Sequence, residues 1–146
     1  MITITATTTT NFGPLDALRA ILTAPPQAEV GIPATDPENA QKGRFNEFGT
    51  DTAPARSFLV STAALYRRVY ATGLTSGVAL AIRSGKASEA TKGVRLCAQL
   101  YHRDILRRID AGIRPPNAPP TLARKSGTTP LIDTGAMRRA IVWRIR

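Results

Sequence analysis

A long stretch of helical periodicity in the middle of the chain constrains the fold most. Apolar side chains recur every four residues over residues 59–82, which predicts an amphipathic helix of about seven turns. A break at Ser84 and Gly85 separates it from a second predicted helix over residues 88–112. The expected buried face of the second helix carries Val94, Ala98, Tyr101, Ile105, Ile109 and Ile113. Together the two helices predict an αα-hairpin that holds much of the core.

Two glycines interrupt the first of these helices. Gly73 and Gly77 each cost about 1 kcal/mol relative to Ala in a helix interior. Such a cost indicates close backbone packing, a bend, or a split into two helices, and the sequence leaves all three open.

Three short segments have strand character. Ile and Thr alternate over residues 2–8, although the Thr-rich run that follows is also typical of a frayed arm. Residues 28–34 form a short apolar stretch in which Pro33 marks a strand end or a sheet edge. Over residues 141–146, Ile141, Trp143 and Ile145 alternate with more polar positions. We therefore predict one α+β domain over residues 1–146, in which a small β-sheet of N-terminal, Val30 and C-terminal strands packs on the long helical hairpin.

Two shorter helices precede the hairpin. Apolar spacing predicts one over residues 14–22, which the prolines at 25 and 26 end. Asp36 followed by Pro37 predicts a capped helix start, and Gly49 predicts its end just after Phe48.

The last quarter of the chain, residues 113–146, is too rich in Pro and Gly for one helix, and we call it the C-terminal clasp. Its prolines at 115 and 116 end the hairpin, and Asn117 or Thr121 is placed to cap a single turn around residues 122–125. Asp133, Thr134 and Gly135 predict the N-cap and first turn of a short helix that runs through residue 139.

The charge of the chain is strongly basic and unevenly placed. The 146 residues carry a formal net charge of +10. From position 91 onward there are twelve Lys or Arg against three acids, whereas residues 1–90 carry eight against seven. A basic half is typical of contact with nucleic acid, and it also fits a solvated surface or an acidic neighbouring subunit.

Familiar catalytic patterns are incomplete in this sequence. The Gly85-Lys86 pair lacks the first Gly and the following Ser or Thr of a phosphate-binding loop. Cys97 and His102 are five residues apart, which places them on different helix faces. The single Asp133-Thr-Gly resembles the aspartic protease triplet, but capping explains it better. We therefore predict no enzyme activity, no cofactor and no metal.

The cysteine count and the lack of long apolar runs predict the cellular compartment. One cysteine allows no intrachain disulfide, which favours a reducing environment. No run approaches the roughly 20 apolar residues of a membrane span, and the N-terminus lacks the features of a signal peptide. We expect a protein made in the cytoplasm and used there or in a particle assembled there, with no membrane partner.

Glu47 is the one ionisable residue that local rules leave unexplained. It ends the predicted helix beside Phe48 and Gly49, where the helix dipole disfavours a carboxylate. Either Arg44 or Arg56 could offset this as a partner, and the alternative is a solvated Glu with no partner.

Two segments together resemble a known family. NEFGT at residues 46–50 is followed by PARSFL at residues 54–59, and the clasp contains GIRPPNAPPTLARK and TPLIDTGAMRRAI. This order of motifs is similar to that of the tail-completion or head–tail connector (neck) proteins of long-tailed bacteriophages, also called virion morphogenesis proteins. The resemblance covers roughly residues 28–146, with the middle helices similar only in character. The position of Ser57 is often Pro in such proteins.

The resemblance implies a small α+β subunit of a homo-oligomeric ring, commonly hexameric, between the head connector and the tail. The expected partners are other copies of the chain, a head-side connector or stopper protein, a tail terminator or tail tube protein, and packaged DNA in transit. The expected location is the virion neck, assembled in host cytoplasm. Alternatives are a ring that terminates the tail tube and a basic DNA-binding protein acting outside any particle.

The resemblance and the residue patterns together select candidate interface or structural positions. We expect Phe58 and Leu59 to anchor the loop before the first long helix to the helix pair. We expect residues 115–119 and 133–135 to shape the clasp against a neighbouring subunit. The full set of candidates is Glu47, Phe48, Gly49, Arg56, Phe58, Leu59, Pro115, Pro116, Asn117, Pro119, Asp133, Thr134 and Gly135.

Overall fold

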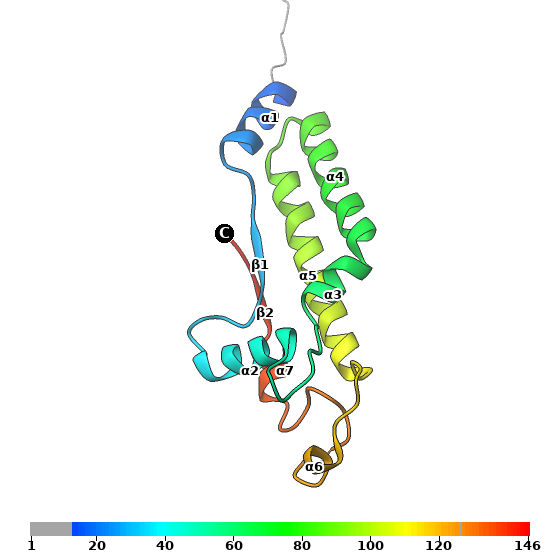
Figure 1. The fold of residues 1–146 in the computed structure, drawn as a ribbon. Helices are drawn as coiled ribbons and strands as arrows, with labels where there is room; N and C mark the ends of the chain where they lie inside the picture. Colours follow the sequence, from blue (N-terminus) through cyan, green and yellow to red (C-terminus); the bar gives the residue numbers. More distant parts are fainter. Residues whose placement is uncertain (1–12, 126) are drawn as a thin grey trace, which may run out of the picture.

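A computed structural model describes residues 13–125 and 127–146, and its centre is a helical hairpin (Figure 1). The hairpin consists of α4, Arg67–Ser84, and α5, Ser88–Asp110. Gly85 joins the two helices in a left-handed conformation with φ of 69°, which Gly adopts at little cost. The predicted αα-hairpin is confirmed.

The predicted seven-turn first helix is divided into α3, Val60–Leu65, and α4. The division lies at Tyr66, whose φ of −103° and ψ of 14° leave the helical region. It does not lie at the glycines. A Cβ added to Gly77 would stand 2.9 Å from the Cα of Gly93, so Gly77 serves close packing of α4 on α5. Close packing and a split both occur, at different residues.

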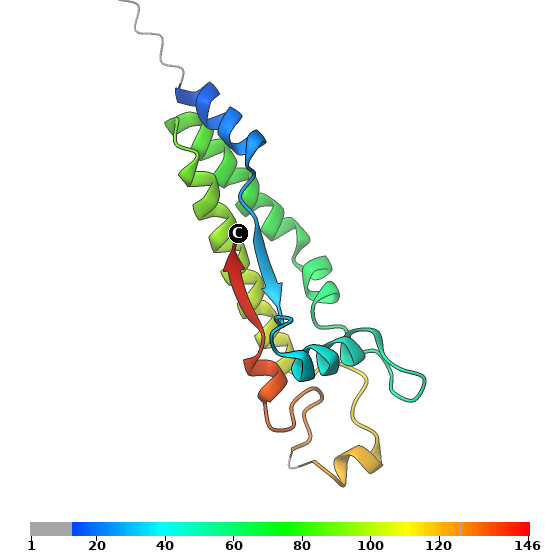
Figure 2. The same cartoon turned by 90° about the vertical axis from the view of Figure 1, so that its left-hand side faces the viewer.

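A two-stranded antiparallel sheet lies along α5 (Figure 2). It consists of β1, Ala28–Gly31, and β2, Val142–Ile145. Along β2 the side chain of Trp143 is partly buried and those of Val142 and Arg144 are exposed, as the alternation predicts. The small sheet packed on a helical hairpin confirms the predicted α+β fold. The predicted N-terminal strand over residues 2–8 lies outside the described residues.

The shorter N-terminal helices also follow the sequence. α1, Gly13–Thr23, packs on α4 at the end of the hairpin opposite the clasp (Figure 1). α2, Pro37–Phe48, begins as predicted, because the Asp36 carboxylate accepts the Asn39 amide at 3.2 Å. It ends at Gly49, whose φ is 78° and whose amide donates to the Phe45 carbonyl at 2.8 Å.

The clasp contains two single turns, and both begin differently from the prediction. α6, Pro119–Leu122, starts at a proline, whose fixed φ suits a first helical position. The prediction of a turn at residues 122–125 capped by Asn117 or Thr121 was therefore wrong. Ala118 occupies the cap position without a side-chain bond, and the Asn117 side-chain Nδ2 donates to the Thr128 carbonyl at 3.0 Å.

The second turn, α7, Ala136–Arg139, was predicted with Asp133 as its cap, and that assignment was also wrong. Gly135 precedes the helix with φ of 77°, a left-handed conformation that Gly adopts at little cost. The Thr134 hydroxyl accepts the Ala136 amide at 3.3 Å, and Asp133 is exposed.

The largest buried side chains gather at the clasp end of the hairpin. They come from the loop before α3, from α5, from α7 and from the residue that precedes β2: Phe58, Ile105, Ile109, Met137 and Ile141. Ile105 and Ile109 belong to the predicted buried face of α5. This cluster fixes the clasp and the Phe58 loop against the same helix.

Candidate assembly site

Glu47 organises the junction between α2 and α3. Its side chain is buried, with a relative exposure of 5%, although it carries a charge. The carboxylate accepts four hydrogen bonds, one from the Ser57 hydroxyl and three from backbone amides at the start of α3. The donors are Ser57 Oγ at 2.6 Å and the amides of Phe58, Leu59 and Val60 at 2.8, 2.9 and 2.9 Å. Each carboxylate oxygen thus accepts two of these bonds.

The predicted partners of Glu47 were therefore wrong. Neither Arg44 nor Arg56 contacts the carboxylate, because the N-terminus of α3 occupies the position expected for the cation. The first amides of a helix lack partners within it and carry a partial positive charge, so they bind an anion well. α3 has no side-chain cap from its own N-cap residue, Leu59. Glu47 supplies that cap from a distant position and thereby joins the two helices.

The charge state of Glu47 follows from these contacts. Burial alone would raise the pKa of this carboxyl group. The hydrogen bonds from Ser57 and the three amides outweigh burial and hold the pKa below its usual value. Glu47 is therefore ionised at neutral pH, and the charge is matched by donors rather than by a cation.

Arg56 connects the same loop to the clasp. Its Nε donates to the Pro115 carbonyl at 2.7 Å, and its Nη2 donates to the Pro116 carbonyl at 2.9 Å. The guanidinium presents its donors in a fixed fork, which two successive carbonyls can fill together. The Arg56 amide in turn donates to the Asn46 carbonyl at 2.6 Å. Arg56 of the PARSFL motif thus contacts the RPP segment of the clasp on one side and Asn46 of the NEFG motif on the other.

Further contacts fasten the clasp, and sequence reasoning missed their residues. The Asn46 amide group contacts Met137 Sδ at 3.6 Å. His102 Nε2 lies 2.9 Å from the Ile141 carbonyl, immediately before β2. Arg138 forms a two-point ion pair with Asp110, at 2.6 and 2.7 Å. Their partners are distant in sequence, so local patterns carry no signal for them.

A second buried polar group lies between α4 and α5. Asp104, with a relative exposure of 8%, accepts the Tyr70 hydroxyl at 2.9 Å and the guanidinium of Arg103. Burial is the main cause that raises the pKa of Tyr70, and the hydrogen bond to Asp104 raises it further. The arrangement ties the two helices and offers no activated nucleophile.

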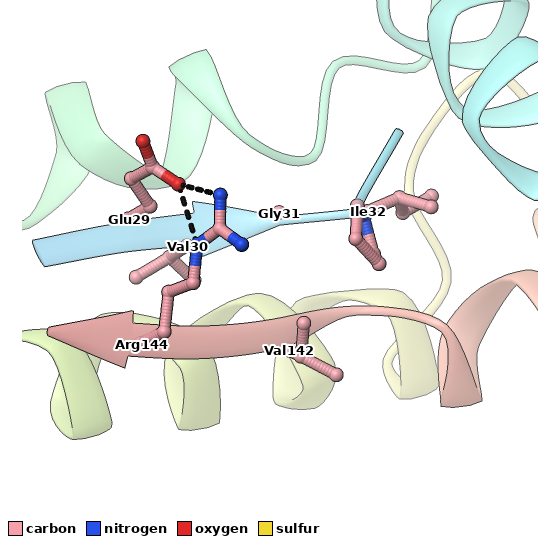
Figure 3. Close-up of a pocket in the computed structure, with 7 residues that line it drawn as sticks. Glu29, Val30, Gly31, Ile32, Val142 and Arg144 are labelled. Carbon is pink, nitrogen blue, oxygen red and sulfur yellow. Dashed lines mark hydrogen bonds and ion pairs between the residues drawn. The ribbon is translucent and has the colours of Figure 1, made fainter. Parts of the chain in front are cut away.

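A shallow hollow lies beside the sheet, and Figure 3 shows its lining residues. Its two charged residues, Glu29 and Arg144, face each other across the strands and form an ion pair at 2.6 Å. The hydrogen bond from Arg144 is the main cause that lowers the pKa of Glu29. The two charges of the hollow are thus paired with each other.

The structure brings some predicted positions together and leaves others apart. Glu47, Phe58 and Leu59 meet at the start of α3, and Arg56 meets Pro115 and Pro116. Gly49 allows a close approach, since a Cβ there would lie 2.8 Å from the Ala55 amide nitrogen. The remaining predicted positions take no part in this junction, and they are Phe48, Asn117, Pro119, Asp133, Thr134 and Gly135.

The arrangement can hold chain segments together, and its chemistry is that of hydrogen bonds and packing. Among the described residues, no group of three His, Cys, Asp or Glu side chains is placed to hold a metal. Burial raises the pKa of the Cys97 thiol, which keeps it in the less reactive protonated form. In the same part of the chain, no helix combines the length and apolar character needed to cross a bilayer.

Comparisons with protein-family models, with curated proteins and with solved structures found no match for this chain.

Proposed function

We propose that this chain is a structural, non-catalytic subunit of a homo-oligomeric ring in the neck of a long-tailed phage virion. The ring would join the DNA-filled head to the tail and let DNA pass. The observation that carries the proposal is the double hydrogen bond from Arg56 to the Pro115 and Pro116 carbonyls. It joins the two sequence segments on which the resemblance to neck proteins rests, so those segments form one unit.

Exposed apolar side chains support an assembling role. Phe48 is 72% exposed and Phe45 is 48% exposed, both on α2 beside the junction. Val60, at the start of α3, is 63% exposed. Exposed aromatic and aliphatic side chains that gather beside a rigid junction are typical of protein–protein contacts. In the proposal these residues contact a neighbouring subunit.

The exposed face of α5 supports transient contact with DNA. Lys92, Arg103 and Arg107 are spaced by eleven and four residues, which places them on one helix face, and all three are exposed. Lys92 and Arg103 pair with acidic neighbours, whereas Arg107 forms no ion pair with another described residue. A ring that presents this face to its channel would attract phosphate without reading sequence.

The test combines assembly with infectivity. We expect the purified protein to form rings by native mass spectrometry and to be present in purified virions. Arg56→Ala should lower both the ring fraction and the infectious titre, because the loop loses its bond to the clasp. Arg124→Ala is the matched control, since it removes the same charge from an exposed clasp position.

Two results would contradict the proposal. One is a stable monomer that is absent from purified virions. The other is a monomer or dimer that binds DNA with an affinity falling steeply with salt, which would favour a DNA-binding protein acting outside any particle.

A further inference from the structure

An apolar hollow of about 230 Å³ lies between α2 and the start of α3. Its lining includes buried Phe58 and the exposed side chains of Phe48 and Val60. Two charged residues, Glu47 and Arg44, also line it. The carboxylate of Glu47 is filled by the four hydrogen bonds described above, whereas Arg44 is exposed and forms no ion pair with another described residue. The hollow therefore combines an apolar lining with one unpaired cation.

This combination fits an apolar side chain that stands next to a carboxylate. The apolar side chain would leave water when it enters the hollow, and the carboxylate would pair with Arg44 beside it. A partner that brought only a cation to this place would be repelled. The charge of the hollow therefore selects among the exposed apolar side chains that could enter it.

One end of α1 meets both conditions. α1 buries Ala17 and packs on α4, but Leu15 is 63% exposed. Asp16, next to Leu15, is exposed and forms no ion pair with another described residue. Leu22 is 74% exposed, but the one charged residue within a turn of it is Arg19, which has the same sign as the cation of the hollow. The Leu15 end of α1 is therefore the end that fits.

The charges of the two surfaces are complementary in pairs. Arg44 and Asp51 both line a second hollow at the end of α2, beside the first. Asp16 and Arg19 are three residues apart on α1, so their side chains are neighbours on the helix surface. None of the four forms an ion pair with another described residue. Asp16 can thus face Arg44 while Arg19 faces Asp51, and the reverse placement would bring like charges together.

The other acidic residues do not offer an exposed apolar neighbour and a free carboxylate together. Asp133 follows Ile132, whose side chain packs against the core cluster. Asp36 accepts the Asn39 amide at the start of α2. The acids that form ion pairs within the chain are Glu29, Glu38, Glu89, Asp104 and Asp110.

The α1 surface cannot reach the hollow of its own chain. Gly13, at the start of α1, lies against Gly85, since a Cβ on Gly85 would stand 3.0 Å from the Gly13 Cα. Gly85 follows the last turn of α4, whereas the hollow lies beside α3, which precedes the first turn of α4. α4 has 18 residues and is about 27 Å long, and Figure 1 shows α1 and α2 at opposite ends of the hairpin. The two surfaces can therefore meet only between two copies.

We propose that α1 of one copy docks at the junction between α2 and α3 of a second copy, with Leu15 in the hollow. In this contact Asp16 lies beside Arg44, and Arg19 lies beside Asp51. The inference rests on the proposed homo-oligomeric ring and names the contact between its neighbours. Because the two surfaces differ, each copy offers α1 to one neighbour and its junction to another, which is the head-to-tail contact that a ring requires.

Charge reversal in the full-length chain tests the pairing. Asp16→Arg and Arg44→Asp should each raise the protein concentration at half assembly by at least roughly tenfold, because each brings like charges together. The double variant restores opposite charges and should return to within roughly threefold of the wild type. Arg124→Asp is the matched control, since it makes the same charge change at an exposed clasp position and should leave assembly unchanged. Sedimentation velocity over a concentration series measures all four.

Cysteine cross-linking tests the place of Leu15. In a Cys97→Ala background, a chain with Leu15→Cys is mixed with a chain that carries Val60→Cys and a mass tag. Under mild oxidation we expect a disulfide between the two chains. Leu22→Cys is the matched control on the same helix, about 10 Å farther along its axis, and should give at least roughly tenfold less. One chain with both Leu15→Cys and Val60→Cys should link into species larger than a dimer.

Several outcomes would overturn the proposed contact. They are a double charge variant that does not recover, equal linkage from positions 15 and 22, and linkage of the Val60→Cys chain to itself, which would show junctions paired across a two-fold axis. Rings seen by native mass spectrometry without linkage from position 15 would also overturn it and leave the proposed ring intact. Linkage from position 15 that stops at dimers would support the α1 contact and contradict the ring.

Discussion

At the clasp end of the helical hairpin the buried side chains are large, whereas at the opposite end, where α1 lies, they are small. The clasp end buries Phe58, Ile105 and Ile109 completely, together with most of Met137 and Ile141. At the α1 end the buried residues are Ala17, Gly77, Ala81 and Ala90. The clasp end is stabilised by tightly packed large side chains and specific hydrogen bonds. The α1 end is stabilised by the close approach of two helix backbones.

This difference explains where the distinctive sequence lies. A junction such as that of Glu47 with the start of α3 requires a carboxylate at one position, matched by a side-chain hydroxyl and by three backbone amides that proline could not supply. Close helix packing requires only that side chains stay small, and many sequences meet that condition. The motifs therefore gather at the clasp end, while the α1 end has a general helical character. Substitutions that remove side-chain volume should destabilise the clasp end, and substitutions that add side-chain volume should destabilise the α1 end.

Replacing Phe58 by Ala should have the largest effect. The ring is fully buried in the core cluster, so its removal leaves a cavity and should lower the free energy of unfolding by about 3–5 kcal/mol. Urea unfolding followed by circular dichroism measures this change. Leu22→Ala is the control, because removing a large apolar side chain at a 74% exposed position outside the proposed subunit contact should change stability by no more than about 0.5 kcal/mol. Similar losses in both variants would show that Phe58 does not anchor the clasp end.

The parts of the fold that depend on neighbouring residues in the sequence were predictable. Apolar periodicity predicted both hairpin helices, and the alternation of apolar and polar residues predicted β2. Asp36 predicted the start of α2, and Gly49 predicted its end. The break at Tyr66 was not predictable in position. The helix segment before it is fixed by distant groups, since Glu47 caps its start and Arg108 donates to the Ser61 and Thr62 hydroxyls at 2.6 and 2.9 Å.

The candidate site was predictable in part for the same reason. Glu47 was predicted to need a partner because a carboxylate at the C-terminal end of a helix is unfavourable, but the expected partners were cations. The true partners are backbone amides, which are exposed as donors only because a new helix begins at Val60. Arg56 lies 59 and 60 positions before the two prolines whose carbonyls it contacts. No local spacing rule predicts a contact between residues so far apart in sequence. At Asp133 the capping rule failed because Gly135 supplies the conformation before α7.

Replacing Glu47 by Gln should have the next largest effect at the clasp end. The amide keeps the shape but loses the charge and directs two donors at groups that are themselves donors. We expect the free energy of unfolding at pH 7 to fall by about 2–3 kcal/mol. Glu38→Gln is the matched control on the same helix, since its carboxylate forms only an exposed ion pair with Lys42 and should contribute no more than about 0.5 kcal/mol.

The same variant makes a prediction about pH. The folded state lowers the pKa of Glu47, so the unfolded state binds more protons as the pH falls below the ordinary value of about 4.3. The stabilisation is therefore fully present above that value and is lost as the pH falls through the lower pKa of the folded state. The stability difference between the wild type and Glu47→Gln should shrink over this acidic range. A constant difference from pH 7 to pH 3 would mean that the charge of Glu47 does not support the junction.

Replacing Gly77 by Ala tests the α1 end and should have the smallest effect of the three. Ala is the better helix former by about 1 kcal/mol, so a glycine without a packing role would be improved by this change. A Cβ at this position would stand 2.9 Å from the Cα of Gly93, and a backbone atom cannot move aside as a flexible side chain can. Forcing α4 and α5 apart should cost about 1–3 kcal/mol, so we expect a net loss of about 1 kcal/mol in thermal or urea unfolding. Ser76→Ala, at the exposed neighbouring position, should be neutral or slightly stabilising. Stabilisation by Gly77→Ala as well would mean that the two ends of the hairpin do not differ in the way they are packed.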